Sequence, residues 1–294
     1  MNSRWMIVQG RTVLTAGAVL AVLLLAGGWG IQRIVLAAAQ QETMLLPAAM
    51  YHSVTDAGDS PAQYVISPSM LESDLQYLQA HGRETVTVRD LLAYVQDGAA
   101  LPEKPVLLTF DDGYYNNYKY AYPLLKQYGM RAVLSPVASL TERFSQTDEA
   151  EQEAWSYCTG RELREMADSG VFEIQNHSYD FHELKPRKGC LRMAGETAAA
   201  YRQCFLSDTR RAQDLFVSLG IEAPVCYTYP YGAVNAEAQA LTAVCGFSVT
   251  LRCEEGVTAL TRDTACLKGI RRNNRDGRWS SAQFWDALLA QTEG

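Results

Sequence analysis

Two adjacent carboxylates follow a strongly apolar run in the middle of the chain. The run Val106–Phe110 has the composition of a buried strand, and it leads directly into Asp111-Asp112-Gly113. Two buried carboxylates are costly without a cation or hydrogen-bond donors. Because successive side chains on a strand diverge, one carboxylate can bind a metal ion while its neighbour accepts a proton. A solvated Asp-Asp-Gly turn is the alternative.

Two of the four histidines lie in a short segment after another predicted strand. His177 and His182 follow the run Phe172–Gln175. Residues five apart face different sides of a helix, but a loop at a strand end can turn both imidazoles toward one ion. With one carboxylate they would form a site with open positions for water, which suits Zn²⁺, with Co²⁺, Ni²⁺ or Fe²⁺ as alternatives. Two unrelated histidines are the other interpretation.

A third segment, Tyr229-Pro230-Tyr231-Gly232, closes the run Val225–Tyr229. Proline and glycine favour a turn, and the aromatic rings could line a groove of the size of a sugar. Taken alone, this segment is more typical of an ordinary β-turn.

The elements that position these segments alternate along the chain. Helical patterns separate the apolar runs, which predicts a mostly parallel α/β sheet, either open or closed into a barrel. In such folds the chemistry lies at the carboxyl ends of the strands. The predicted strands are Leu45–Tyr51, Val106–Phe110, Arg131–Val137, Phe172–Gln175, Val225–Tyr229 and Phe247–Leu251, and the predicted helices are Ser69–His81, Tyr118–Tyr128, Gly160–Ser169, Thr197–Leu219 and Asn235–Val244.

Composition narrows the class of protein. The chain has 294 residues, of which 48% are hydrophobic and 20% charged, as in globular proteins. The net charge of −7 gives no basic surface for a phosphate backbone, so we expect no nucleic acid partner.

The N-terminus carries a run without ionisable groups from Thr12 to Ile31, long enough to cross a bilayer. We expect a cytoplasmic tail at 1–11, a transmembrane signal anchor at 12–31, a linker at 32–44 and a catalytic domain at 45–294. This arrangement places the protein in the cell membrane as a single-pass protein with its domain outside. A signal peptide cleaved near residues 37–39 is the alternative, and it would make the protein secreted.

Seven cysteines, all from Cys158 onward, form no Cys-x-x-Cys pair and therefore no typical zinc knuckle. Outside the cell, Cys190 with Cys204 or Cys253 with Cys266 could pair, whereas all seven could equally be buried and reduced.

Taken together, the three segments resemble the polysaccharide deacetylase (NodB-type) family of metal-dependent carbohydrate esterases. The resemblance covers most of residues 45–275, and Thr109–Gly113 is its most specific motif. It implies a deformed (β/α) barrel, often of seven strands. It also implies that Asp112, His177 and His182 are the metal ligands and that Asp111 is the catalytic base.

The details are most similar to the poly-N-acetylglucosamine deacetylases. The five-residue histidine spacing, Met50-Tyr51-His52 and the Tyr-Pro-x-Gly turn all match that subgroup. The resemblance implies release of acetate from an N-acetylglucosamine polymer, with the backbone N–H of Tyr231 holding the oxyanion. O-acetyl groups of xylan-like polymers, peptidoglycan, or mere glycan binding by an inactive module are the alternatives.

Two departures from the family pattern concern the base and the acid. Thr228 stands where many relatives carry an arginine that holds the base. The late Leu-x-His motif is missing, and Leu267–Ile270 takes its strand, which leaves His52 as the candidate general acid. The basic run Arg271, Arg272, Arg275 and Arg278 is interpreted as a solvated face.

Overall fold

The computed structural model describes residues 43–57, 61–147 and 151–292. The predicted tail, membrane anchor and nearly all of the linker fall in residues 1–42, which lie outside the described residues. Among the helices within the described ranges, none has the length and apolar character needed to cross a membrane.

The centre of the fold is a parallel sheet built around one fully buried strand. Its strands, in spatial order, are β13 (Asn273–Asn274), β2 (Ala48–Tyr51), β6 (Pro105–Asp112), β7 (Ala132–Pro136) and β8 (Phe172–Ile174), with β5 (Glu84–Val86) also paired to β6. Every residue of β6 is buried. A parallel strand covered on both faces reads as an unbroken apolar run, which explains the sequence that precedes Asp111.

A second parallel sheet completes a barrel. Its strands are β9 (Cys226–Thr228), β10 (Val249–Leu251) and β12 (Lys268–Ile270). Asn176, just beyond β8, bridges in parallel to Tyr227 of β9. At the other side, β12 continues through Arg271 and Arg272 into β13, so one stretch of chain pairs first with β10 and then with β2. The predicted parallel α/β class is confirmed.

One buried cluster fills the barrel. The barrel strands β2, β6, β7, β9, β10 and β12 contribute to it Ala48, Leu107, Val133, Cys226, Val249 and Ile270. Because side chains alternate along a strand, Thr109 and Asp111 continue the inward-facing row of Leu107. Leu108 and Phe110 instead join the cluster between the sheet and the surrounding helices. Asp111 therefore faces the carboxyl-terminal mouth of the barrel.

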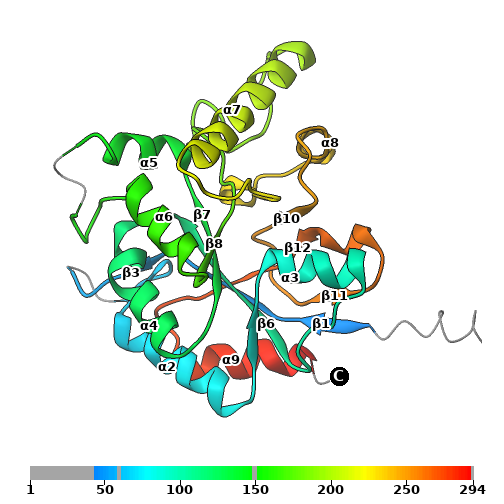
Figure 1. The fold of residues 1–294 in the computed structure, drawn as a ribbon. Helices are drawn as coiled ribbons and strands as arrows, with labels where there is room; N and C mark the ends of the chain where they lie inside the picture. The colour runs from blue at the N-terminus through cyan, green and yellow to red at the C-terminus, as the bar shows by residue number, and fades with distance from the viewer. Residues whose placement is uncertain (1–42, 58–60, 148–150, 293–294) are drawn as a thin grey trace, which may run out of the picture. The chain divides into compact units, whose positions relative to one another are not determined.

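Helices surround this sheet (Figure 1). They are α2 (Pro68–Ala80), α3 (Val88–Leu92), α4 (Tyr122–Gln127), α5 (Ala138–Phe144), α6 (Gly160–Asp168), α7 (Ala198–Ser218), α8 (Ala236–Val244) and α9 (Ser281–Leu289), with the short helical turns η1 (Ala93–Asp97), η2 (Asn117–Ala121), η3 (Pro230–Gly232), η4 (Thr264–Leu267) and η5 (Ala290–Thr292). Leu75, Leu163 and Leu288 belong to the cluster outside the barrel. All five predicted helices are present.

Local residue types fix where these elements begin and end. Ser67 caps α2 by accepting a hydrogen bond from the Met70 N–H, so the helix begins earlier than the predicted Ser69. The predicted strand Leu45–Tyr51 is divided at Pro47 into two strands that pair with different partners. The short strands outside the barrel are β1 (Met44–Leu46), antiparallel to β11 (Thr258–Leu260), and β3 (Ser53–Val54), parallel to β4 (Val65–Ile66).

Candidate active site

Asp112, His177 and His182 meet at the mouth of the barrel. Asp112 Oδ1 lies 3.0 Å from His182 Nε2 and 3.4 Å from His177 Nε2. One ligand atom of each residue lies within 4.8 Å of the other two. Three ligands of one tetrahedral Zn²⁺ at about 2.05 Å would be roughly 3.3 Å apart. The spacing therefore fits a divalent ion.

The polar atoms of this cluster fit the same interpretation. Asp112 Oδ1 is buried and has no hydrogen-bond partner of good geometry, as expected of an oxygen that ligates an ion. His177 Nδ1 lies 2.8 Å from the carbonyl oxygen of Thr228, which fixes the ring so that Nε2 faces Asp112. Burial alone would raise the pKa of Asp112, but the two histidines hold it well below its usual value. Asp112 is thus held ionised, as a candidate metal ligand must be.

The backbone around Asp112 is shaped to turn the carboxylate over the strand end. Asp112 has a φ of 68°, in the left-handed region that side chains other than glycine rarely adopt. Gly113 follows with a φ of 81°, and a Cβ there would lie 2.5 Å from Cβ of Pro136. Only glycine fits at this position. Strain of this kind persists where the surroundings impose it, as they do at functional sites.

The loop after β8 brings both imidazoles together despite their five-residue spacing. The Asn176 side chain accepts a hydrogen bond from the Ser178 N–H at 2.7 Å, and Ser178 Oγ accepts one from the Phe181 N–H at 3.0 Å. These two tight turns leave the rings of His177 and His182 with centroids 5.2 Å apart.

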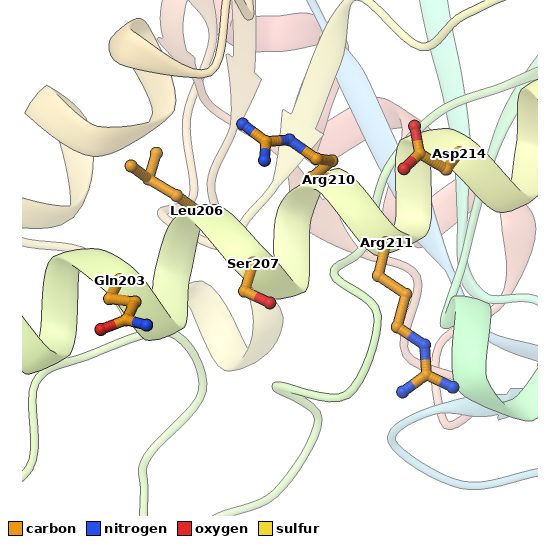
Figure 2. Close-up of a pocket in the computed structure, with 6 residues that line it drawn as sticks. All are labelled: Gln203, Leu206, Ser207, Arg210, Arg211 and Asp214. Atoms are coloured by element: carbon orange, nitrogen blue, oxygen red, sulfur yellow. The ribbon is translucent and has the colours of Figure 1, made fainter.

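Helix α7 holds the same loop from outside. The Asp208 carboxylate accepts hydrogen bonds from the N–H groups of Tyr179 and Asp180, at 2.9 and 2.8 Å. Arg211 lies over the Tyr179 ring, 3.7 Å from its centroid. Figure 2 shows Arg211 with its neighbours along α7, where they line a hollow of about 560 Å³ that shares no residue with the Asp112 cluster.

Asp111, the neighbouring carboxylate, has a different environment. Arg272 binds it at two points, with Nη1 2.6 Å from Oδ1 and Nη2 2.8 Å from Oδ2. Arg272 also donates to Thr109 Oγ1 at 3.1 Å. Burial would raise the pKa of Asp111, but the guanidinium outweighs it and lowers that pKa. Asp111 is therefore held ionised without occupying a position among the metal-ligand candidates.

The interpretation of the basic run as a solvated face is wrong for two of its members. Arg272 and Arg275 are both buried, whereas Arg271 and Arg278 are exposed. Arg275 forms a second buried pair with Asp74, with Nε 2.8 Å from Oδ2. The reason is topological: this stretch crosses between the two sheets, so Arg272 faces Asp111 at the barrel mouth whereas Arg275 faces Asp74 of helix α2. Thr228, in place of the expected arginine, instead shares a hydrogen bond with Ser135 at 2.7 Å.

His52 directly follows β2 at the same mouth. Its Nδ1 is buried without a hydrogen-bond partner, and its ring meets the edge of Tyr64 with centroids 4.8 Å apart. Burial lowers the pKa of His52, although Asp111 and Asp112 act in the opposite direction. The imidazole is thus a partly desolvated base with a free ring nitrogen.

The third predicted segment divides between the site and the core. Tyr231 is 41% exposed and stacks on His182 with centroids 4.6 Å apart. Tyr229 and Pro230 are buried, and the Tyr229 hydroxyl is 3.0 Å from Thr242 Oγ1 in α8. The expectation that Tyr229 lines a sugar groove is therefore wrong, because its ring points inward from β9 into a packed aromatic cluster.

Seven free thiols are present, and neither predicted disulfide forms in the structure. Cys253 Sγ instead lies 3.8 Å from Arg272 Nη2, and Cys190 Sγ lies 3.2 Å from the carbonyl oxygen of Ala233. The thiols of Cys190 and Cys226 are buried, so they pack as small apolar side chains.

A model of the polysaccharide deacetylase family matches residues 98–250, which include both aspartates and both histidines. The chain belongs to this family. Its predicted class, a hydrolase of the polysaccharide deacetylase type, is confirmed. The late strand of this deacetylase, β12, contains no histidine, so the missing Leu-x-His motif is not restored by the fold.

The chain is also similar in sequence to named bacterial deacetylases. This deacetylase is 25% identical over 246 residues to the poly-beta-1,6-N-acetyl-D-glucosamine N-deacetylase of Escherichia coli strain K12, covering 77% of the chain and 36% of that protein. It is 27% identical over 175 residues to the Staphylococcus aureus protein of the same name, covering 58% of the chain and 55% of that protein. The chain thus spans about a third to a half of these relatives.

One solved structure is similar throughout the barrel. The BpsB deacetylase domain of Bordetella bronchiseptica matches with a TM-score of 0.64 and 26% identity, covering 79% of the chain and 96% of that domain.

Several residues beside the site carry no clear functional signal in the sequence. The sequence pattern places Arg272 on the surface. Tyr114 and Tyr157 stack with centroids 4.8 Å apart, and burial, followed by the charge of Asp112, raises the pKa of Tyr114. The only signal in the sequence was the position of Tyr114 immediately after Asp111-Asp112-Gly113.

Proposed function

We propose that this protein is a metal-dependent deacetylase that removes N-acetyl groups from an N-acetylglucosamine polymer and releases acetate. The observation that carries the proposal is that two adjacent carboxylates have different partners. Asp112 faces two histidines, whereas Asp111 faces only donors of hydrogen bonds from the protein. One carboxylate is arranged to hold an ion and the other to accept a proton.

Asp112, His177 and His182 would hold the ion. A divalent ion bound there supplies an acidified water and polarises the acetamide carbonyl. Zn²⁺ suits a set of two imidazoles and one carboxylate, and Co²⁺, Ni²⁺ and Fe²⁺ accept similar ligands.

Asp111 takes the proton from the attacking water as general base. Its two-point pairing with Arg272 fixes the carboxylate in one orientation before the reaction, which a single hydrogen bond would not do. Tyr231 lies beside the Asp112 cluster, since its ring stacks on His182. By the likeness to the family, its backbone N–H would stabilise the negative charge on the carbonyl oxygen.

His52 would donate a proton to the departing amine. It ends the strand next to β6 and has a ring nitrogen that no protein group occupies. Loss of the bond between the carbonyl carbon and nitrogen leaves acetate and a free amino sugar.

The glycan is proposed from the relatives, two of which are named for poly-beta-1,6-N-acetyl-D-glucosamine. An inactive glycan-binding module is less consistent with the site, because Arg272 supplies the guanidinium that Thr228 lacks and keeps Asp111 ionised. O-acetylated xylan and peptidoglycan are the competing substrates.

Metal analysis of the purified protein, combined with acetate release from several polymers, tests the proposal. We expect close to one divalent ion per chain and the fastest release from β-1,6-linked N-acetylglucosamine oligomers. Acetylated xylan, peptidoglycan and chitin oligomers are the comparison substrates. Faster release from any of these would overturn the substrate assignment, and metal binding without release from any would indicate a binding module.

We further propose that the run Thr12–Ile31 anchors this domain on the outer side of the cell membrane. The run has no ionisable group, and the exported location would give the enzyme access to a surface polymer. Fractionation of cells and protease treatment of intact cells test this. Recovery of the chain in the soluble cytoplasm would contradict it.

A further inference from the structure

Two exposed tyrosine rings each contact a histidine of the site. Tyr64 is 48% exposed and meets His52 edge to face, and Tyr231 is 41% exposed and stacks on His182. His52 and His182 belong to different strand ends, one after β2 and the other in the loop after β8. A molecule that reaches the reacting centre therefore meets an aromatic ring beside each histidine.

Hydrogen bonds hold the turn that carries Tyr64. The Tyr64 carbonyl oxygen accepts a hydrogen bond from the Ser53 N–H at 3.1 Å, which joins it to the segment just after His52. Gln63 Nε2 donates to the Tyr64 hydroxyl at 3.2 Å. An exposed ring restrained in this way loses little conformational freedom when a ligand binds to it.

The closing strand of the barrel anchors this turn. Asn274 Nδ2 donates to the carbonyl oxygen of Gln63 at 2.7 Å, and the Gly277 N–H donates to that of Ala62 at 2.9 Å. A Cβ at Gly277 would lie 2.1 Å from the carbonyl oxygen of Val65, so only glycine permits this approach. The position of Tyr64 is thus fixed by the same chain segment that carries Arg272.

We propose that Tyr64 is a sugar-binding residue that stacks on the pyranose ring next to the one being deacetylated. This inference rests on the proposed function and names one wall of its glycan site. A pyranose presents an apolar face of C–H groups and a rim of hydroxyls. An exposed tyrosine ring matches that distribution, because its faces are apolar and its hydroxyl lies at the tip. Because Tyr64 contacts His52, the sugar that it binds lies on the side of the departing amine.

The test compares substrates that do and do not have a neighbouring sugar. Tyr64→Ala is expected to raise KM for a pentamer of β-1,6-linked N-acetylglucosamine roughly tenfold while kcat changes less than twofold. Hydrolysis of 4-nitrophenyl acetate, which has no sugar, is expected to remain at the wild-type rate. Tyr64→Phe keeps the ring and loses only the hydroxyl, so its KM for the pentamer is expected to be closer to that of the wild type than to that of Tyr64→Ala.

Tyr128→Ala serves as the matched control. This tyrosine lies just after α4, where its hydroxyl bonds to Glu72 and Gln76 of α2, and it contacts none of the site residues described above. Equal loss of activity on the pentamer and the aryl ester in Tyr64→Ala would show that Tyr64 supports His52 rather than a sugar, and would overturn the proposal. An unchanged KM for the pentamer would overturn it too.

Binding to an inactive background separates this inference from the proposed function. In Asp111→Asn, titration calorimetry with the pentamer is expected to show roughly tenfold weaker binding when Tyr64→Ala is added. This measurement does not require the glycan to be a substrate. Absence of acetate release in the wild type would defeat the proposed function, whereas equal affinities with and without Tyr64→Ala would defeat the sugar-binding role alone.

Discussion

Asp111 and Arg272 are 161 residues apart in the sequence and form a two-point ion pair inside the barrel mouth. Both side chains are almost completely excluded from water. A buried pair of this kind is weak evidence for net stability, but removing one partner leaves an uncompensated charge. The pair therefore has clear consequences for mutation.

Replacing Arg272 is expected to damage both the fold and the activity. Arg272→Met leaves a buried Asp111 without its cation, which typically costs about 3–5 kcal/mol of the free energy of unfolding. Arg272→Lys keeps a charge but loses the planar fork, so we expect a smaller loss of stability and a large loss of kcat. Urea unfolding and acetate release measure the two effects. Arg271→Met is the control, since Arg271 is exposed and, among the residues that the structure describes, forms its ion pair with Glu254. Similar losses of stability and activity in Arg272→Met and Arg271→Met would contradict this account of the buried pair.

Substitution of the two aspartates is expected to separate metal binding from proton transfer. Asp111→Asn should keep the ion and lower kcat by about 10² to 10⁴. Asp112→Ala and His177→Ala should lose both activity and at least about 100-fold in metal affinity. Elemental analysis and acetate release are the measurements. His81→Ala, at an exposed histidine that stacks on Tyr77, is the control. Full turnover in Asp111→Asn would remove it as the base.

His52, as the proposed proton donor, is expected to make the rate of the reaction depend on pH. Burial lowers the pKa of His52 from 6.5, so the protonated form is lost as the pH rises through a value below 6.5. We expect kcat/KM of the wild type to fall as the pH rises through this pKa. We expect His52→Ala to be slower and to show no such decrease. Rates measured from pH 5 to 9 test this. A wild-type rate in His52→Ala would eliminate the assignment as proton donor.

Asp208 is expected to link pH to stability through the histidine loop. Burial raises its pKa to about 6 from 3.8, so the folded protein binds a proton more tightly than the unfolded chain between these values. The contribution of Asp208 to the free energy of unfolding therefore decreases as the pH rises from about 4 to 6, by at most about 3 kcal/mol. The free energy of unfolding of the wild type, minus that of Asp208→Asn, should therefore be smaller at pH 7 than at pH 4.5.

The same residue is expected to influence metal binding. Asp208→Ala removes both acceptors of the Tyr179 and Asp180 N–H groups, so the loop between the histidines loosens and metal affinity falls about tenfold. Asp214→Ala is the matched control, because Asp214 is exposed on the same helix and bonds to no residue of the loop (Figure 2). Unchanged metal affinity in Asp208→Ala would show that the turns at Asn176 and Ser178 suffice.

The sequence by itself determined the residues of the candidate metal site and the class of fold. Asp111-Asp112-Gly113 follows a buried strand immediately, and His177 and His182 share one loop, so local order was enough to indicate both. Alternation of apolar runs with helical patterns likewise predicted a parallel α/β sheet. These features depend on neighbours in the chain, which is why they can be seen without coordinates.

Only the tertiary structure decided which groups serve those residues. Arg272 reads as one member of a basic surface run, yet the closing strand turns it inward against Asp111. Tyr229 reads as a sugar-facing aromatic, yet the end of β9 turns it into the core, while Tyr64 carries no local signal and lies against His52. Which face a side chain takes near a strand end depends on how distant strands pair, and no local pattern specifies that pairing.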